Sequence, residues 1–135
     1  GCRPNYNSVV ATMCYRAVKG LPLVVNGDGR QGRDFVYIDD AVSALVLAGF
    51  ELVSGTGKIF NVSSGRKTSI KQIVRQICRL HKNTRVEFLT DKKNAGISYC
   101  CDPSKFSGKY GWRPRVSLSK GIEQTLSYYR GRKIT

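Results

Sequence analysis

The sequence predicts an α/β fold in which about five helices accompany mixed small sheets. Segments with apolar residues at three-to-four-residue spacing alternate along the chain with short β-rich runs bounded by Gly, Asn and Asp. No internal repeat and no low-complexity tract interrupts this alternation. With 135 residues, 41% of them hydrophobic, the chain has enough material for one core. We therefore expect residues 1–135 to form one domain or part of one.

The first third of the chain predicts a helix, a strand, a turn and a second strand. Within residues 5–19, apolar side chains recur at helical spacing, and Gly20 is expected to end that helix. Residues 23–25 form a short apolar run that is closed by the turn-forming sequence NGDG. Residues 33–38 (RDFVYI) are rich in β-forming types and predict the second strand.

The middle of the chain predicts two helices with a strand between them. Asp39 is expected to cap a helix of sequence AVSALVLAGFEL, whose nearly continuous apolar surface predicts burial. Residues 58–62 (KIFNV) predict a strand, with Asn61 as a buried amide at its end. Ser69 and Gln72 have capping-box spacing, and the next helix has an apolar and a basic face. We expect the basic face to be a solvated surface; it carries Lys71, Arg75 and Arg79.

The last third predicts a strand and two further helices. Residues 86–89 predict the strand, and residues 90–101 lack periodicity and are expected to form a loop. Asp102, followed by a proline, predicts the start of a short helix, and Trp112 is expected to be a buried anchor in the turn beyond it. Ser119 is expected to cap the last helix, whose apolar face is formed by Ile122, Leu126 and Tyr129.

Cysteine, histidine and apolar content exclude several classes of protein. The five cysteines are odd in number and form no CxxC pair, which argues against a disulfide framework and a zinc site and favours a reducing, cytoplasmic location. No run approaches the length of about 20 apolar residues that a membrane span needs, so we expect no membrane partner. The single histidine, His81, ends a helix and is interpreted as complementing the helix dipole.

The positive charge lies almost entirely in the second part of the chain. Residues 1–57 carry five basic and five acidic side chains, whereas residues 58–135 carry eighteen basic and four acidic ones, giving a net charge of +14. Such a field attracts nucleic acid, a phosphate-bearing ligand or an acidic remainder of the same polypeptide. Composition alone does not choose among these partners.

Two short motifs match NAD enzymes literally but lack the necessary context. Gly27, Gly29 and Gly32 spell GxGxxG, yet a β-rich segment follows them where a dinucleotide site needs a helix amino terminus. We therefore predict a turn between two strands. Tyr15 with Lys19 spells YxxxK, as does Tyr129 with Lys133, but no nucleotide-binding sheet precedes either pair. We interpret these tyrosines and lysines as surface or packing residues.

Four blocks in order resemble the second half of nucleotide-sugar epimerases, dehydratases and decarboxylases of the extended short-chain dehydrogenase/reductase family. The blocks are GCR, LPLVVNGDGRQGRDFVYIDDAV, KIFNVSSGRKTSI and DPSKFSGKYGWRPRVSLSKGIEQTLSYYR, and together they span nearly the whole chain. The resemblance implies the carboxy-terminal part of an NAD-binding Rossmann-type enzyme. It also implies that residues 1–135 form the substrate-binding portion, with a strand and helix near 58–82 that complete the NAD-binding sheet of the missing amino-terminal half.

The resemblance implies five residues of a pocket for a nucleoside-diphosphate sugar. Arg33 matches the family's diphosphate-binding arginine, and its alternative role is a surface salt bridge to Asp34 or Asp28. Val24 and Asn26 match positions beside the base and ribose, although a plain edge-strand role is the alternative. Asn7 matches an asparagine at the start of the substrate-side helix, where it could equally be a helix cap. Lys92 falls where the family carries an arginine; a lysine holds phosphate as a point charge without the arginine fork.

The implied chemistry belongs mainly to residues outside this sequence. In the family, NAD and the catalytic tyrosine and lysine lie in the amino-terminal half, so no catalytic residue is expected here and this portion alone is expected to be inactive. The complete enzyme would act through a transient keto-sugar and could be a homodimer. Two alternatives remain: a non-catalytic basic module that binds nucleic acid, and a degenerate regulatory relative. We do not expect nucleic acid to be the partner.

Overall fold

The computed structural model describes residues 8–50, 57–90 and 97–131. Within these ranges the chain forms five helices and two small sheets, which confirms the predicted α/β class. The elements follow in the order α1 (Val9–Val18), β1 (Leu23–Asn26), β2 (Gly32–Asp34), α2 (Ile38–Phe50), β3 (Lys67–Ser69), α3 (Ile70–Leu80), β4 (Val86–Leu89), α4 (Ser104–Tyr110) and α5 (Leu118–Gly131). None of these helices is long and apolar enough to cross a bilayer.

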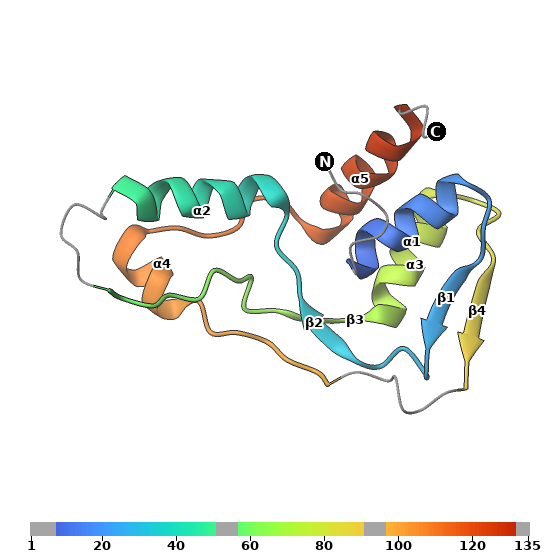
Figure 1. Ribbon diagram of the computed structural model, residues 1–135, viewed down its shortest axis with the longest axis horizontal. Helices are drawn as coiled ribbons and strands as arrows, with labels where there is room; N and C mark the ends of the chain where they lie inside the picture. The colour runs from blue at the N-terminus through green and yellow to red at the C-terminus, as the bar shows by residue number, and fades with distance from the viewer. Residues whose placement is uncertain (1–7, 51–56, 91–96, 132–135) are drawn as a thin grey trace.

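The larger core lies where α1, α3 and α5 pack together beside β1 and β4 (Figure 1). Strand β1 pairs in parallel with β4, and Val25 of β1 lies opposite Phe88. The inward faces of the three helices bury apolar side chains at the predicted helical spacing, among them Met13, Ile73, Ile77, Ile122 and Leu126. Burial of a side chain of this size is worth about 1.5 to 3 kcal/mol, so this cluster supplies most of the stabilisation.

A second, aromatic cluster holds α2 against α4. Phe106 of α4 lies at its centre, with ring centroids 4.7 Å from Tyr110 and 5.6 Å from Trp112. Trp112 is buried as predicted, and its indole N–H donates to the Ser43 hydroxyl on α2 at 2.8 Å. The segment after α4 is therefore fixed against α2 by both packing and a hydrogen bond.

Two carboxylates join the segments that lie between the clusters. Asp34, at the end of β2, accepts hydrogen bonds from the Ser64 N–H and hydroxyl and from the Gly65 N–H. Asp40, in the first turn of α2, is 5% exposed and accepts from the main-chain N–H groups of Arg115 and Val116 at 3.0 and 2.9 Å. Both carboxylates satisfy main-chain donors of segments distant in the sequence, which sets where those segments run.

The prediction that the second helix is buried is wrong for most of its surface. Ala44 is fully buried, but large apolar side chains of α2 are exposed in the described part of the chain: Ile38, Val42, Leu45, Val46, Leu47 and Phe50, with Leu45 at 68% and Phe50 at 79%. In the described structure, the covered face of α2 carries Ala44 and Ala48 and packs against the aromatic cluster. Apolar residues on every side predict burial only when further structure is present to cover them.

Of the four predicted strands, two are confirmed, a third is confirmed only in part, and the fourth is wrong. Residues 23–25 and 86–89 form β1 and β4, and β2 begins the predicted strand. That strand ends at Asp34, because β3 pairs with only three of its residues. Residues 58–62 have no strand partner in the described ranges, and a strand needs one. Asn61 is exposed instead of buried; its side chain donates to the Asp102 carbonyl.

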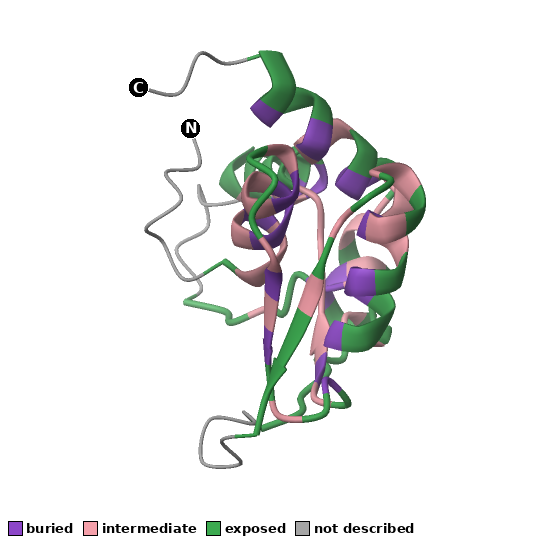
Figure 2. Ribbon diagram, turned by 90° about the vertical axis from the view of Figure 1, so that its right-hand side faces the viewer, coloured by how far each residue is buried: buried purple, intermediate pink, exposed green. Residues whose placement is uncertain are grey.

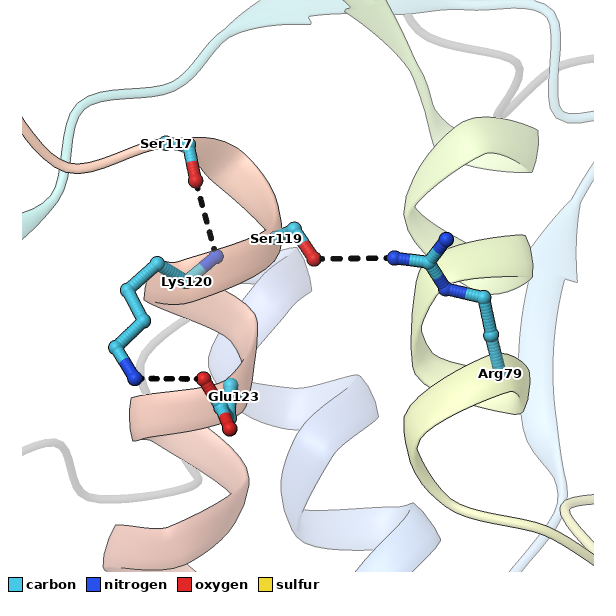
Figure 3. A network of polar contacts seen from close by, with 5 residues as sticks. All are labelled: Arg79, Ser117, Ser119, Lys120 and Glu123. Carbon is cyan, nitrogen blue, oxygen red and sulfur yellow. Dashed lines mark hydrogen bonds and ion pairs between the residues drawn. The ribbon is translucent and has the colours of Figure 1, made fainter.

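The starts of α2 and α5 lie two residues before the predicted ones, whereas the start of α3 is as predicted. Its capping box is present as predicted, with Ser69 and Gln72 bonding reciprocally. Helix α2 starts at Ile38, which places Asp39 inside the first turn and not at the cap. Helix α5 starts at Leu118, and the Ser117 hydroxyl accepts the Lys120 N–H. The predicted cap Ser119 accepts from Arg79 of α3 instead (Figure 3).

Candidate functional site

A cavity of about 400 Å³ opens between α1, β1 and β2. Its polar lining includes side chains from both strands and from the segment after residue 96. The cavity brings together three of the five predicted site residues: Val24, Asn26 and Arg33. The other two, Asn7 and Lys92, lie outside the described residues. Ligand pockets commonly have about 300 to 1,000 Å³, so this volume suits part of a nucleotide.

The glycine motif forms a turn between β1 and β2, as predicted, and does not begin a helix. Gly27 and Gly29 have φ values of +69° and +73°, a region that favours glycine. The carbonyls of Gly29 and Gln31 accept the N–H groups of Lys71 and Ile70, at the start of α3. A dinucleotide phosphate needs free N–H groups at a helix start, and here the loop itself occupies them. The glycine turn therefore does not fit an NAD phosphate site.

Arg33 lies at the centre of β2 with its guanidinium in the cavity lining. Its Nη1 donates to the carbonyl of Gly32 at 3.0 Å and to the carbonyl of Ile97, and its Cζ lies 4.8 Å from the centre of the Tyr99 ring. Carbonyls and a ring face orient the guanidinium without neutralising its charge. The described residues give Arg33 no salt bridge, because Asp28 pairs with Arg30 and Asp34 with main-chain and hydroxyl donors.

The segment at residues 97–100 closes one side of the cavity along β2. The Gly32 N–H donates to the Ser98 hydroxyl at 2.8 Å, and the Tyr99 N–H donates to the Gly32 carbonyl at 3.1 Å. Beside it, the Cys100 thiol donates to Asp34 at 3.4 Å. Partial desolvation raises the pKa of Cys100, and the hydrogen bond and negative charge of Asp34 raise it further. This thiol is therefore held protonated at neutral pH.

Tyr99 and Gln31 are among the cavity residues that were not predicted. Tyr99 lies within residues 90–101, which have no periodicity in the sequence. Only its contact with Arg33 in the folded chain identifies it as a cavity residue. Gln31 lies within the motif that contains Arg33, and its side chain donates to the Asn26 carbonyl at 2.9 Å. The position of Gln31, two residues before Arg33 in the same glycine-rich segment, was the signal that could have found it.

Residues interpreted as structural lie away from this cavity. Tyr15 of the first YxxxK pair packs edge-on against Tyr129, with ring centroids 5.7 Å apart. His81 ends α3, where its ring contacts the Thr84 hydroxyl. Among the residues that the structure describes, no three His, Cys, Asp or Glu side chains gather as a metal site. Lys133, of the second pair, lies outside the described residues.

Comparison with known families identifies relatives over nearly the whole chain. The family model described as GDP-mannose 4,6 dehydratase matches residues 5–125. The dTDP-glucose 4,6-dehydratase of an Actinoplanes species is 30% identical over 98% of this chain and 43% of its own length. The human dTDP-D-glucose 4,6-dehydratase is 30% identical over 78% of this chain and 32% of its own. The chain thus spans less than half the length of these relatives.

Solved structures of epimerases have the same fold. The UDP-glucose 4-epimerase of Thermotoga maritima, solved with UDP-glucose, matches with a TM-score of 0.78 and 30% identity over 95% of this chain and 41% of its own. The UDP-glucuronic acid 4-epimerase of Bacillus cereus, in complex with UDP-glucuronic acid and NAD, matches with a TM-score of 0.82 and 29% identity over 95% of this chain and 40% of its own. With fold and sequence in agreement, this chain belongs to the GDP-mannose 4,6-dehydratase family of nucleotide-sugar epimerases and dehydratases within the extended short-chain dehydrogenases/reductases.

Proposed function

We propose that this chain is the nucleotide-sugar-binding portion of an NAD-dependent nucleotide-sugar epimerase or dehydratase that acts through a transient keto-sugar. The relatives in sequence are named as dehydratases and those in structure as epimerases, so the proposal covers both reactions. Such a portion has to hold the nucleotide so that the sugar reaches the reacting groups. The cavity between α1, β1 and β2 is the part of the described structure suited to that role.

The observation that carries the proposal is the environment of the Arg33 guanidinium in the cavity. The guanidinium lines the cavity, is oriented by two carbonyls and a ring face, and contacts no carboxylate in the described residues. Only Nη1 of the guanidinium donates to these carbonyls, so its other N–H groups can form two parallel hydrogen bonds to a diphosphate. Val24 and Asn26, on β1, line the same cavity, where they would contact the base and ribose. Asn7 and Lys92 complete the proposed set.

The redox cofactor belongs, in this proposal, to residues that the described structure does not include. The glycine turn does not fit NAD, so no step is assigned to the cofactor here. Residues 58–62 would add a strand to an NAD-binding sheet, which would supply the strand partner that they lack. The helix expected to accompany that strand was α3, but its apolar face is already buried in the larger core. We therefore propose that the exposed apolar side chains of α2 cover the sheet.

Replacing Arg33 tests the proposal in the complete enzyme. Arg33→Ala should raise the dissociation constant for UDP or dTDP roughly ten- to a hundredfold, the equivalent of about 1.5 to 3 kcal/mol for a charge-assisted contact. Arg33→Lys should recover only part of the affinity, because the ammonium cannot form the bidentate contact. Isothermal titration calorimetry measures both effects.

Arg30→Ala is the matched control. Arg30 lies three residues earlier, in the turn before β2, but it is exposed and pairs with Asp28 outside the cavity lining. Its loss should leave nucleotide affinity unchanged. Equal losses from both variants would mean that overall charge, and not the Arg33 contact, drives binding. Unchanged affinity in Arg33→Ala with a lower melting temperature would make Arg33 a purely structural residue.

A further inference from the structure

A second, larger cavity of about 720 Å³ lies on the other side of β2. Its walls come from residues 63–68 and 102–118, and none of the residues proposed for the nucleotide lines it. Phe35, just after β2, lines both cavities and separates them. With Phe35, Trp112 and Pro114 contribute apolar surface to the lining. The volume falls within the range of about 300 to 1,000 Å³ that is common for small-molecule sites.

Three arginines line this cavity, and none of them has an anionic partner in the described part of the chain. Arg66 contributes from one wall, and Arg113 and Arg115 from the other. Across the described residues, none of the three side chains forms a hydrogen bond or salt bridge, although other arginines such as Arg30 do. Like charges repel when they share a concave surface, so this arrangement is stabilised by whatever negative group enters it.

The carboxylate on the same wall does not neutralise the arginines by contact. Asp102 accepts the Ser104 N–H at 2.9 Å and the Ser104 hydroxyl at 2.9 Å. These hydrogen bonds lower the pKa of Asp102, so it is ionised at neutral pH but engaged with its own helix start. With one carboxylate against three guanidinium groups, the lining retains a positive charge.

The two arginines of the second wall sit on a fixed backbone. The Arg115 N–H donates to the buried Asp40 carboxylate, and the Trp112 indole donates to Ser43. Pro114, between the two arginines, restricts the backbone further. A ligand therefore has to order guanidinium side chains only, since the main chain that bears them is already in place.

We propose that this cavity is a second ligand site, separate from the nucleotide cavity, that takes a small molecule bearing two or more phosphate groups. Arginine forks match phosphate oxygens bidentately, and three of them from two segments of the lining suit more than one phosphate. Hydroxyl groups on the lining, such as those of Ser64 and Ser117, add further polar surface. The apolar surface of Trp112 and Pro114 would contact the uncharged part of such a ligand.

The single tryptophan of the chain gives a direct readout for this cavity. Trp112 lines it, whereas no tryptophan lines the nucleotide cavity. Titration of the 135-residue chain with inorganic pyrophosphate at constant ionic strength should give a saturable change in tryptophan fluorescence. Absence of saturable change, together with absence of heat in calorimetry, would contradict the proposal.

Charge-matched variants distinguish a site from general attraction. Arg113→Gln with Arg115→Gln should weaken pyrophosphate binding by about tenfold or more, because charge-assisted contacts are lost. Lys71→Gln with Arg75→Gln removes the same charge from the exposed face of α3 and should leave the fluorescence titration within about twofold, because screened surface charges contribute little. Equal weakening by both pairs would overturn the proposal.

Two further variants keep the test decisive. Arg66→Gln removes an exposed guanidinium from the opposite wall and should also weaken binding, so the result does not depend on the folding of one variant. Arg33→Gln removes the nucleotide-cavity arginine and should leave the fluorescence titration unchanged. If Arg33→Gln abolishes the tryptophan response, pyrophosphate acts from the nucleotide cavity and the second site does not exist. That outcome would leave the proposed nucleotide function intact, which distinguishes the two.

Discussion

At the scale of single residues, a few polar side chains fix the path of long irregular segments. Asp40 is the clearest case, because a buried carboxylate accepts two main-chain N–H groups from residues 115 and 116. Those donors would otherwise lack a partner inside the fold. Asp34 does the same for the turn at Ser64 and Gly65. Both cavities lie against segments held in this way.

Asp40→Ala should therefore destabilise the chain by about 1 to 3 kcal/mol for each main-chain donor left without a partner. Asp39→Ala is the matched control: it removes a neighbouring, exposed carboxylate from the same first turn and should cost only about 0.3 to 1 kcal/mol through the helix dipole. Urea denaturation measures both free energies of unfolding. Similar losses in the two variants would show that the Asp40 hydrogen bonds contribute nothing specific.

At the scale of elements, α3 illustrates how local signals and tertiary contacts agree. Its capping box satisfies one end of the helix locally, and the glycine turn supplies carbonyls to the N–H groups of Ile70 and Lys71. The apolar face then packs into the larger core while Lys71 and Arg75 remain exposed. The helix start is thus specified twice, by its own sequence and by the turn before β2.

Ser69→Ala should cost about 1 kcal/mol of stability, the usual effect of removing a hydroxyl cap. Ser127→Ala serves as the control, because Ser127 is exposed within α5, where alanine is the better helix former. It should leave stability unchanged or slightly raised. Thermal unfolding followed by circular dichroism compares the two. A Ser69 variant as stable as its control would mean that the turn carbonyls alone hold the start of α3.

At the scale of the whole molecule, the apolar surface is unevenly distributed. The larger core covers the inward faces of three helices, whose buried residues are purple in Figure 2. Helix α2, in contrast, has exposed apolar side chains in the described structure. A contiguous apolar surface of this kind marks a site of contact with other structure. The proposed contact is the NAD-binding sheet of a complete enzyme.

Leu45→Lys tests this assignment in the 135-residue chain. Leu45 is 68% exposed, so the lysine should lower the binding of an apolar fluorescent dye while changing stability by no more than about 0.5 kcal/mol. Leu21→Lys, which replaces an apolar residue that is 43% exposed outside α2, should alter dye binding less. In the complete enzyme, the same Leu45 substitution should destabilise the fold. A Leu45 variant that unfolds the isolated chain would show that α2 is packed within it.

The sequence by itself determined the elements whose signals are local. The helical spacing in α1, α3 and α5, the capping box of Ser69 and the turn at Gly27 and Gly29 depend on neighbours within a few residues, and all were predicted correctly. The resemblance also predicted the family, and placed Arg33 among the site residues. Local geometry and the order of motifs can be recognised in the sequence without knowledge of the tertiary contacts.

Only the tertiary structure decided which surfaces are covered and which side chains meet. The outward face of α2 was predicted to be buried, and residues 58–62 were predicted to form a strand. The composition of each segment suits either outcome, and the outcome depends on whether other structure is present to cover or pair with it. Tyr99 meets Arg33 across more than sixty positions of sequence, and no periodicity encodes that distance. Burial and long-range contact are properties of the packed chain. The sequence pattern therefore indicates which secondary structure and burial a residue can adopt, and tertiary packing determines which of them it adopts.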